Sequence, residues 1–204
     1  MEWNGLAYDV ELSLKSGREL EHKVKEITSE LDHLAGVDGI NWNSPDQMSY
    51  VLYGGVLKTK EREEYPYTYK SGPRKGTTVL KERIVVLEHN LPRLIDPPKN
   101  AKGAKEGVFS TNEKILAKLK SSDKRVQRIL DGVLELRGLQ KRIGTYYYGI
   151  PKLYKEMEWT NNILHGNLNS CTAVTGRLAS TQPNQQNMDH KIRECIKSRF
   201  AVSS

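Results

Sequence analysis

Residues 165–187 carry side chains that could read a nucleic-acid duplex. Small hydroxyl and amide side chains surround one arginine, Arg177, and the run Pro183-Asn184-Gln185-Gln186-Asn187 follows it. Asn and Gln amides both donate and accept hydrogen bonds, and Arg can fork onto two acceptors. Such a surface suits a minor groove, where purine N3 and pyrimidine O2 acceptors recur in every sequence. An ordinary Asn-rich loop has the same composition, so both interpretations stay open.

Other signatures of chemistry are weak or absent. The sequence has no G-x-x-x-x-G-K-[ST] loop, no G-x-G-x-x-G loop and no H-E-x-x-H motif. Its histidines are scattered, and Cys171 and Cys195 do not form a C-x-x-C pair. The carboxylates after residue 155 are Glu156, Glu158, Asp189 and Glu194. None lies in an apolar strand flanked by turns, as a buried two-metal site needs, so we predict no catalytic residue and no metal ligand in this chain.

The positive charge is concentrated in the middle of the chain. The 204 residues carry 32 Lys and Arg against 25 Asp and Glu, a net charge of +7. Residues 1–57 carry −6, residues 58–105 carry +6 and residues 113–155 carry +7. Such a band is typical of a protein that binds a polyanion, although a solvated charged surface has the same signature. No segment resembles a signal peptide or a membrane span, so we expect a cytoplasmic protein without a membrane partner.

Apolar spacing predicts two helices near the start of the chain. The first covers residues 17–36, with Ser16 and Glu19 as a capping box and Gly36 at its end. It follows a short segment, residues 4–9, that is compatible with a turn and a strand or with a helix entry. A second helix is predicted to start at Ser44-Pro45. Its inward residues are Met48, Val51 and Leu52.

Residues 58–106 interrupt the helical pattern. Two runs rich in β-branched and aromatic residues flank Ser71-Gly72-Pro73, which predicts a hairpin with basic residues at its tip. Tyr65, Tyr67 and Tyr69 alternate along the first strand. They could stack on bases or pack against the scaffold.

Helices are predicted again from residue 110 onward. Ser110 and Glu113 repeat the capping-box pattern, and a longer helix is predicted over residues 123–147. Its inward residues are Val126, Ile129, Leu130, Val133, Leu134, Leu136 and Ile143. Arg137 and Lys141 lie four residues apart, so they share one face of this helix.

Several of these segments together resemble one family. The run Thr175-Gly176-Arg177-Leu178-Ala179-Ser180, followed by Pro183-Asn184-Gln185-Gln186-Asn187, resembles the T-G-R-L-S-S and P-N-L-Q-N signature of family A DNA polymerases. Arg137-Gly138-Leu139-Gln140-Lys141 and Thr145-Tyr146 are similar to the R-G-L-x-K and T-Y segments of that family's thumb helix. The likeness covers nearly the whole chain in order, and residues 58–106 resemble an enlarged insertion of phage enzymes.

The resemblance implies a role for each matched residue. Arg177 would contact the minor-groove edge of the primer-terminal base pair, and Thr175 would shape the turn beside it. The residues that would hold template and primer near that pair are Asn184, Gln186 and Asn187. Arg137 and Lys141 would lie against primer-template phosphates, which gives affinity without sequence preference. An ordinary solvated pair is the alternative for these two.

The catalytic motifs of the family are missing from the 204 residues. The family holds two Mg²⁺ ions with an Asp of a D-Y-S-x-x-E motif and a carboxylate of an H-D motif, and a fingers helix grips the nucleotide. None of these occurs in the sequence. The resemblance therefore implies a helical thumb with a basic insertion in residues 1–150 and the N-terminal part of a palm in residues 151–204. It implies no cofactor bound by this chain itself.

We expect an α+β protein, a mainly helical thumb with a β-hairpin insertion followed by a short β segment of a palm. Its expected function is the primer-template DNA-binding portion of a split family A DNA polymerase, viral and acting in DNA replication in the host cytoplasm. A second polypeptide would supply the remaining palm and the fingers, so the chain alone should incorporate no nucleotide. The alternative is a non-catalytic DNA-binding module or a truncated polymerase remnant.

Overall fold

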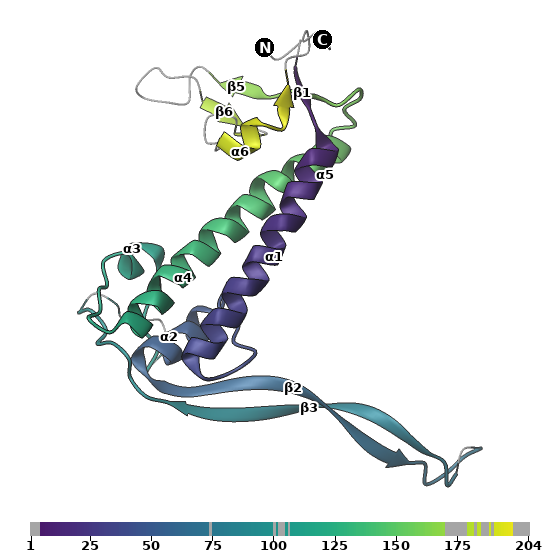
Figure 1. Ribbon diagram of the computed structural model, residues 1–204. Helices are drawn as coiled ribbons and strands as arrows, with labels where there is room; N and C mark the ends of the chain where they lie inside the picture. The colour runs from purple at the N-terminus through teal and green to yellow at the C-terminus, as the bar shows by residue number, and fades with distance from the viewer. Residues whose placement is uncertain are drawn as a thin grey trace. The chain divides into compact units, whose positions relative to one another are not determined.

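The computed structural model describes residues 5–73, 75–99, 101, 105, 107–169, 179–181, 183, 184, 188 and 190–197. Helices and antiparallel strands follow one another along the chain, which confirms the predicted α+β class (Figure 1). The chain divides into two compact units, unit 1 with residues 1–26 and 136–204 and unit 2 with residues 27–135. Both divisions fall inside long helices, α1 (Val10–Ala35) and α4 (Lys124–Arg142). No helix among the described residues is long and apolar enough to cross a membrane.

Unit 1 is organised around its first strand, β1 (Leu6–Tyr8), so of the two alternatives left open for residues 4–9 the structure has the strand. β4 (Ile163–Leu164) and β7 (Ile196–Lys197) both pair with β1 in antiparallel fashion, so β1 is the central strand of this sheet. Its core includes Tyr8, Tyr147, Ile150, Leu164, Met188, Ile192 and Cys195. The start of the chain therefore shares a core with segments more than 130 residues away in sequence.

A buried chain of hydrogen bonds crosses this core. The Tyr8 hydroxyl donates to Ser13 Oγ at 2.7 Å, and Ser13 Oγ donates to the Tyr147 carbonyl at 3.0 Å. Ser13 has no exposed surface, and burial raises the pKa of Tyr8 well above its ordinary value. Because Tyr8 keeps its proton, it acts as the donor. We call these three groups the Tyr8 relay.

Helix α1 begins at Val10 rather than near residue 17, so the predicted Ser16 and Glu19 capping box is wrong. Asp9 caps the helix instead: its Oδ1 accepts a hydrogen bond from the Leu12 amide at 2.9 Å. Lys197 pairs with the same carboxylate at 2.8 Å, and these two contacts lower the pKa of Asp9. Gly17 lies within α1, and it permits close packing there, because a Cβ at this position would lie 3.2 Å from Tyr147.

Unit 2 contains the predicted second helix, α2 (Pro45–Tyr53). Ser44 caps it by accepting a hydrogen bond from the Gln47 amide at 3.4 Å, as predicted. The predicted inward residues Met48, Val51 and Leu52 are all buried. The predicted end of α1 is also confirmed, because Gly36 has a φ of +75° and its amide donates to the Asp32 carbonyl at 2.9 Å.

The short helix α3 (Glu113–Leu116) is capped by Asn112, so the second predicted capping box is also wrong. The Asn112 side chain accepts a hydrogen bond from the Lys114 amide at 3.3 Å. Ser110 lies outside the helix, and its amide donates to the Ala101 carbonyl at 2.7 Å. Asn and Ser are similarly good N-cap residues. Asn112 caps α3 because it directly precedes the first helical residue, Glu113, whereas Ser110 does not.

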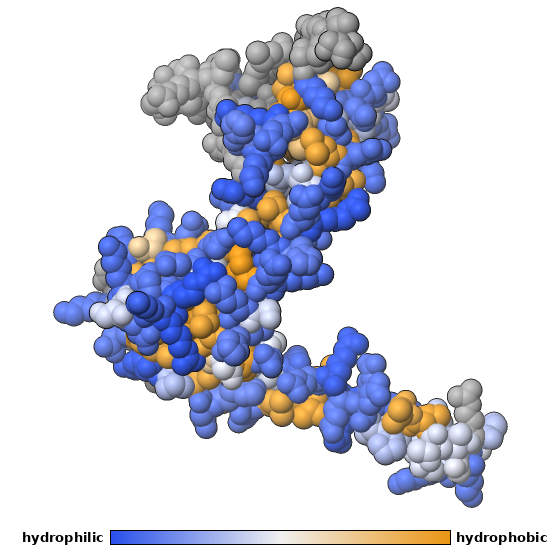
Figure 2. All heavy atoms as spheres, in the orientation of Figure 1, coloured by the Kyte–Doolittle hydropathy of each residue, from blue (hydrophilic) through white to orange (hydrophobic). Residues whose placement is uncertain are grey.

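The long hairpin is present as β2 (Gly55–Thr68) and β3 (Thr78–Leu91), paired in register along their whole length. The ribbon extends away from α2 (Figure 1). Tyr67 contacts both Tyr65 and Tyr69 edge to face. Hydrophobic side chains are visible along the ribbon (Figure 2).

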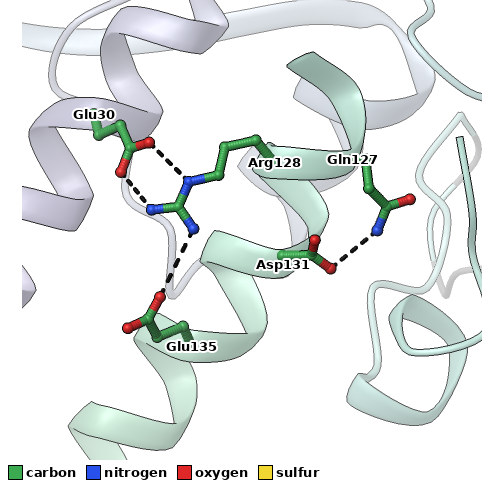
Figure 3. Close-up of polar contacts among 5 residues, drawn as sticks. All are labelled: Glu30, Gln127, Arg128, Asp131 and Glu135. Atoms are coloured by element: carbon green, nitrogen blue, oxygen red, sulfur yellow. Dashed lines mark hydrogen bonds and ion pairs between the residues drawn. The ribbon is translucent and has the colours of Figure 1, made fainter. Parts of the chain in front are cut away.

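Within unit 2, the second half of α1 lies beside the first half of α4 (Figure 1). Arg128 donates to both carboxylate oxygens of Glu30, at 2.7 and 2.5 Å, and lies 3.8 Å from Glu135 (Figure 3). Arg125 Nε donates to the Leu34 carbonyl at 2.6 Å, and a Cβ at Gly132 would meet Leu31 at 2.8 Å. The two helices are therefore fixed by close packing and by one bidentate ion pair.

The remaining elements belong to unit 1. They are the π-helical turn η1 (Ile143–Tyr147), α5 (Gly149–Glu156), β5 (Asn167–Asn169), β6 (Ala179–Thr181) and α6 (His190–Arg193). The helix predicted over residues 123–147 is thus α4 followed directly by η1. Most of its predicted inward residues are buried, and Leu134 is half-buried.

Ser13→Ala should destabilise the protein because it removes both bonds of the Tyr8 relay. The buried Tyr8 hydroxyl then has no acceptor at position 13, and we expect a loss of about 1–3 kcal/mol in the free energy of unfolding. The midpoint of urea unfolding, at unchanged slope, measures the loss. Tyr8→Phe keeps the Ser13 bond to Tyr147 and should cost less, about 0.5–1.5 kcal/mol. A smaller loss for Ser13→Ala than for Tyr8→Phe would contradict the relay.

Glu30→Gln tests the ion pair with Arg128 through pH. Hydrogen bonds from Arg128 lower the pKa of Glu30 below its ordinary value of 4.5. Both side chains are about 40% exposed, so we expect a loss of at most about 1 kcal/mol in the free energy of unfolding at neutral pH. Because the pKa of Glu30 is lower in the folded protein than in the unfolded chain, the ion pair contributes its stability above pH 4.5. That stability is lost as pH falls through the pKa of Glu30 in the folded protein.

Urea unfolding of wild type and Glu30→Gln from neutral pH down to about pH 3 measures this effect. The difference in the free energy of unfolding between the two proteins should shrink as pH falls. Glu19→Gln is the matched control, because Glu19 is an exposed carboxylate of the same helix without an arginine partner in the described structure. The same pH dependence in both variants would rule out a specific effect of Arg128.

Candidate nucleic-acid interface

The last turns of α4 present the basic face that the sequence predicted. Arg137 and Lys141 lie four residues apart in a continuous helix, so they project from the same side. Arg137 is half-buried and Lys141 is exposed. Arg142 is also exposed, which makes the end of α4 basic. The helix dipole stabilises cations in the last turn of a helix, and Lys141 and Arg142 lie in that turn of α4.

Gly138 opens the same surface to close approach. It is exposed, and a Cβ there would meet no described atom within 4 Å. A glycine inside a helix costs about 0.5–1 kcal/mol relative to alanine. Packing within the described chain does not require a glycine here. A surface without a side chain lets a ligand come close to the helix backbone.

Helix α4 ends in the π-helical turn η1, where the Tyr148 amide donates to the Ile143 carbonyl at 3.0 Å. A turn of this kind shifts the direction in which the following side chains project, and such turns are frequent at functional sites. Thr145 is exposed, whereas Tyr146 packs against the core of unit 1. Of the Thr145-Tyr146 pair, Thr145 is therefore at the surface and Tyr146 is in contact with the core.

Strands β5 and β6 frame the Arg-containing motif in the sequence. They pair antiparallel, with Asn167 opposite Thr181 and Asn169 opposite Ala179. Within β6, the Ser180 hydroxyl donates to the Pro183 carbonyl at 3.2 Å, and Ser180 is only 3% exposed. This bond closes a turn just before Asn184, whose side chain is exposed.

The structure describes three of the predicted site residues. Arg137 and Lys141 lie on one helix face, and Asn184 lies in the same compact unit on a separate turn. The others, Thr175, Arg177, Gln186 and Asn187, fall outside the described residues. No three His, Cys, Asp or Glu side chains in the described part of the chain could together hold a metal ion. These residues do not fit a Mg²⁺ site, and we assign them no metal-dependent step.

Comparison with known proteins bears on this surface. The model of the family described as DNA polymerase family A matches residues 84–204, more than half of the chain. The chain belongs to DNA polymerase family A. This match includes the basic face of α4 and the motif between β5 and Asn187.

Several polymerases are similar over nearly all of this chain. DNA polymerase I of Bacillus subtilis is 28% identical over 201 residues, which are 98% of this chain and 17% of that protein. The thermostable DNA polymerase I of Thermus thermophilus is 27% identical over 188 residues, 92% of this chain and 17% of that protein. The chain therefore spans about one sixth of the length of these relatives.

A solved structure shares the fold. It is the POL domain of Pol1 from M. smegmatis in complex with DNA primer-template and dNTP, with a TM-score of 0.56 and 19% identity. The likeness covers 94% of this chain and 26% of that one. In both comparisons this chain aligns with only part of a longer polymerase chain.

Two contributors to the site were missed by sequence reasoning. Gly138 has a visible signal, because a glycine inside a strongly periodic helix needs a reason. Ser180 has little signal, since its burial follows from the β5 and β6 pairing and from the turn to Pro183. Ser180 bonds within the turn before Asn184, and Gly138 leaves the surface of α4 open.

Proposed function

We propose that this chain is the primer-template-binding portion of a DNA-directed DNA polymerase of family A that acts in DNA replication. The observation that carries the proposal is the family match over residues 84–204, which contains the basic face of α4 and the 175–187 motif. The named relatives are DNA polymerases, and the structural neighbour holds a primer-template. In this assignment, residues 1–150 correspond to a thumb with an insertion and residues 151–204 to the start of a palm.

The basic face of α4 would bind the phosphates of the duplex. Arg137 offers a planar fork of donors and Lys141 a mobile ammonium group. Phosphates repeat identically along any sequence, so such contacts hold the duplex without reading it. Gly138, exposed beside these two cations, would let the sugar-phosphate backbone approach the helix. A polymerase that must move along its template needs contacts of this kind.

The 175–187 motif would examine the primer terminus. Every correct base pair presents acceptors at the minor-groove edge, so one Arg177 donor could test geometry at any sequence. Asn184, with its side chain at the surface, would contact template or primer beside that pair, together with Gln186 and Asn187. Thr175 would shape the turn that carries Arg177. Amide and guanidinium donors fit this task because they do not change charge near neutral pH.

The chemical step needs groups that this sequence does not contain. Nucleotidyl transfer by two metal ions requires closely placed carboxylates, and the 204 residues hold neither a D-Y-S-x-x-E nor an H-D motif. We assign the Mg²⁺-binding carboxylates and the nucleotide-gripping helix to polypeptide outside these residues. The second chain expected from the sequence is one way to supply them.

Replacing Arg137 and Lys141 together with glutamine should weaken primer-template binding in a salt-dependent way. Each lost phosphate contact lowers the slope of log affinity against log salt by about 0.9, so we expect a change of about 2. Fluorescence anisotropy with a labelled primer-template at several salt concentrations measures the slope. Two unrelated sequences should lose affinity equally, because the lost contacts go to phosphates.

The matched control replaces Lys152 and Lys155, two exposed lysines of α5 in the same unit, with glutamine. Equal losses in the control and the test variant would mean that only total charge matters. Primer extension with the same preparations should show no nucleotide incorporation by the chain alone. Incorporation by the 204 residues alone would overturn the assignment of the chemical step.

Gly138→Ala should stabilise the fold while weakening DNA binding. Alanine favours a helix over glycine by about 0.5–1 kcal/mol, and the added methyl meets no described neighbour. The same methyl would separate the helix from an approaching sugar-phosphate backbone. Urea unfolding and anisotropy on the same protein measure both effects. Gln140→Ala, two residues further along α4, should leave affinity unchanged, and unchanged affinity for Gly138→Ala would show that nothing approaches this surface.

A further inference from the structure

One face of the long hairpin is open to solvent. Side chains alternate between the two faces of a ribbon, and the register of β2 and β3 places Val56, Leu80, Ile84 and Val86 on the same face. These aliphatic side chains are 42%, 69%, 67% and 51% exposed. Elsewhere in the described structure, Met157 of unit 1 is the large hydrophobic side chain that is comparably exposed. We call this surface of the hairpin the aliphatic face.

The opposite face of the hairpin is better covered by its own side chains. Val79, Val85 and Leu87 on that face are half-buried. Lys81 Nζ lies 3.6 Å from the centroid of the Tyr67 ring, so a long cation and an aromatic ring shield the ribbon there. The aliphatic face has no comparable cover among the described residues.

A ribbon of this kind gains from a second layer. β2 and β3 are each 14 residues long and pair with one another rather than with a third described strand. Two-stranded ribbons are only marginally stable by themselves in water. An exposed aliphatic stripe bordered by charged residues marks a protein contact, because its burial removes apolar area from water. Sheets pack face to face about 10 Å apart, so a second ribbon could cover this face along its length.

The charges of the aliphatic face favour another copy of the same surface as that second layer. They are Lys58, Lys60, Arg62 and Glu64 on β2 and Glu82 and Glu88 on β3. Positive and negative charges are equal in number, so the face does not favour a polyanion or a strongly charged protein. A two-fold rotation about the long axis of the ribbon lays β2 of one copy over β3 of another, which places cations against carboxylates.

We propose that the aliphatic face is a self-association surface, through which two copies of this chain pair with β2 of one over β3 of the other. The assembly ends at two copies, because the pairing covers the aliphatic face of both. A ribbon 14 residues long and two strands wide covers roughly 500 Å² per copy, which is at the small end of specific interfaces. The dimer is therefore weak and reversible, and it does not depend on DNA.

Replacing Ile84 and Val86 together with threonine tests the contact. Threonine keeps a β-branched side chain that suits a strand but makes the face more polar. Sedimentation velocity without DNA should show wild type changing from monomer to dimer as its concentration rises, and the variant should associate at least about tenfold more weakly. The matched control replaces Val79 and Val85 of the same strand, on the opposite face, and should associate like wild type.

Lys60→Glu tests the orientation of the two ribbons without changing an aliphatic side chain. Lys60 is exposed, and no ion pair joins it to another described residue. With β2 over β3, the new carboxylate would face the row of β3 that carries Glu82 and Glu88, so the dimer should weaken. With β2 over β2, it would face cations and the dimer should strengthen. A stronger dimer would therefore overturn the proposed orientation. Because Lys60 is at the surface, circular dichroism should show an unchanged fold.

Three other results would overturn the proposal. Wild type that stays monomeric at every concentration would leave the aliphatic face to a different protein. Equal losses in the Val79 and Val85 control, or in Met157→Gln, would mean that association does not use this face. Growth beyond two copies would indicate open-ended aggregation of exposed ribbons. Primer-template binding is measured separately by anisotropy, so none of these results decides the proposed function.

Discussion

The Tyr8 relay is the constraint on which unit 1 depends. It joins β1, the first turns of α1 and the end of η1, although Ser13 and Tyr147 lie 134 residues apart. Closing so long a loop costs chain entropy, and the relay recovers little unless both bonds form in a dry core. The surrounding side chains supply that environment, because Tyr8, Ser13 and Tyr147 are all almost fully buried. The position of the α4 basic face follows, since η1 continues directly from α4.

The π-helical turn lets one helix serve both the core and the surface. In a regular helix, the face of Arg137 and Lys141 would continue unchanged past residue 143. Across η1, Ile143 and Tyr147 are buried and Thr145 is exposed. Gly149 allows the tight exit, because a Cβ there would lie 2.6 Å from the Gly144 carbonyl oxygen. The Tyr8 relay therefore meets this helix at η1, directly after the turns of α4 that carry Arg137 and Lys141.

Much of the fold could be predicted because its signals are local. The inward residues of α2 and α4, the end of α1 at Gly36 and the hairpin all follow from spacing and turn residues close in sequence. The two predicted capping boxes were wrong because Asp9 and Asn112 cap the helices instead. Asp9 also forms an ion pair with Lys197, which has no local signal in the sequence. The pairing of β1 with β4 and β7 has no local signal. At the site, spacing predicted the shared face of Arg137 and Lys141, whereas the burial of Ser180 depends on its partners in three dimensions.

Net charge alone does not identify the binding surfaces of this chain. Lys58 and Arg83 of the hairpin and Arg128 of α4 belong to the same basic band, yet each forms an ion pair across two strands or two helices. Such exposed pairs contribute little stability, but they remove charge that would otherwise attract a polyanion. Lys141, Lys70 and Lys75 are exposed, and no ion pair joins their side chains to another described residue. A phosphate can neutralise such a group without breaking an existing pair, so exposed cations outside ion pairs are better candidates for the proposed contact than the net charge is.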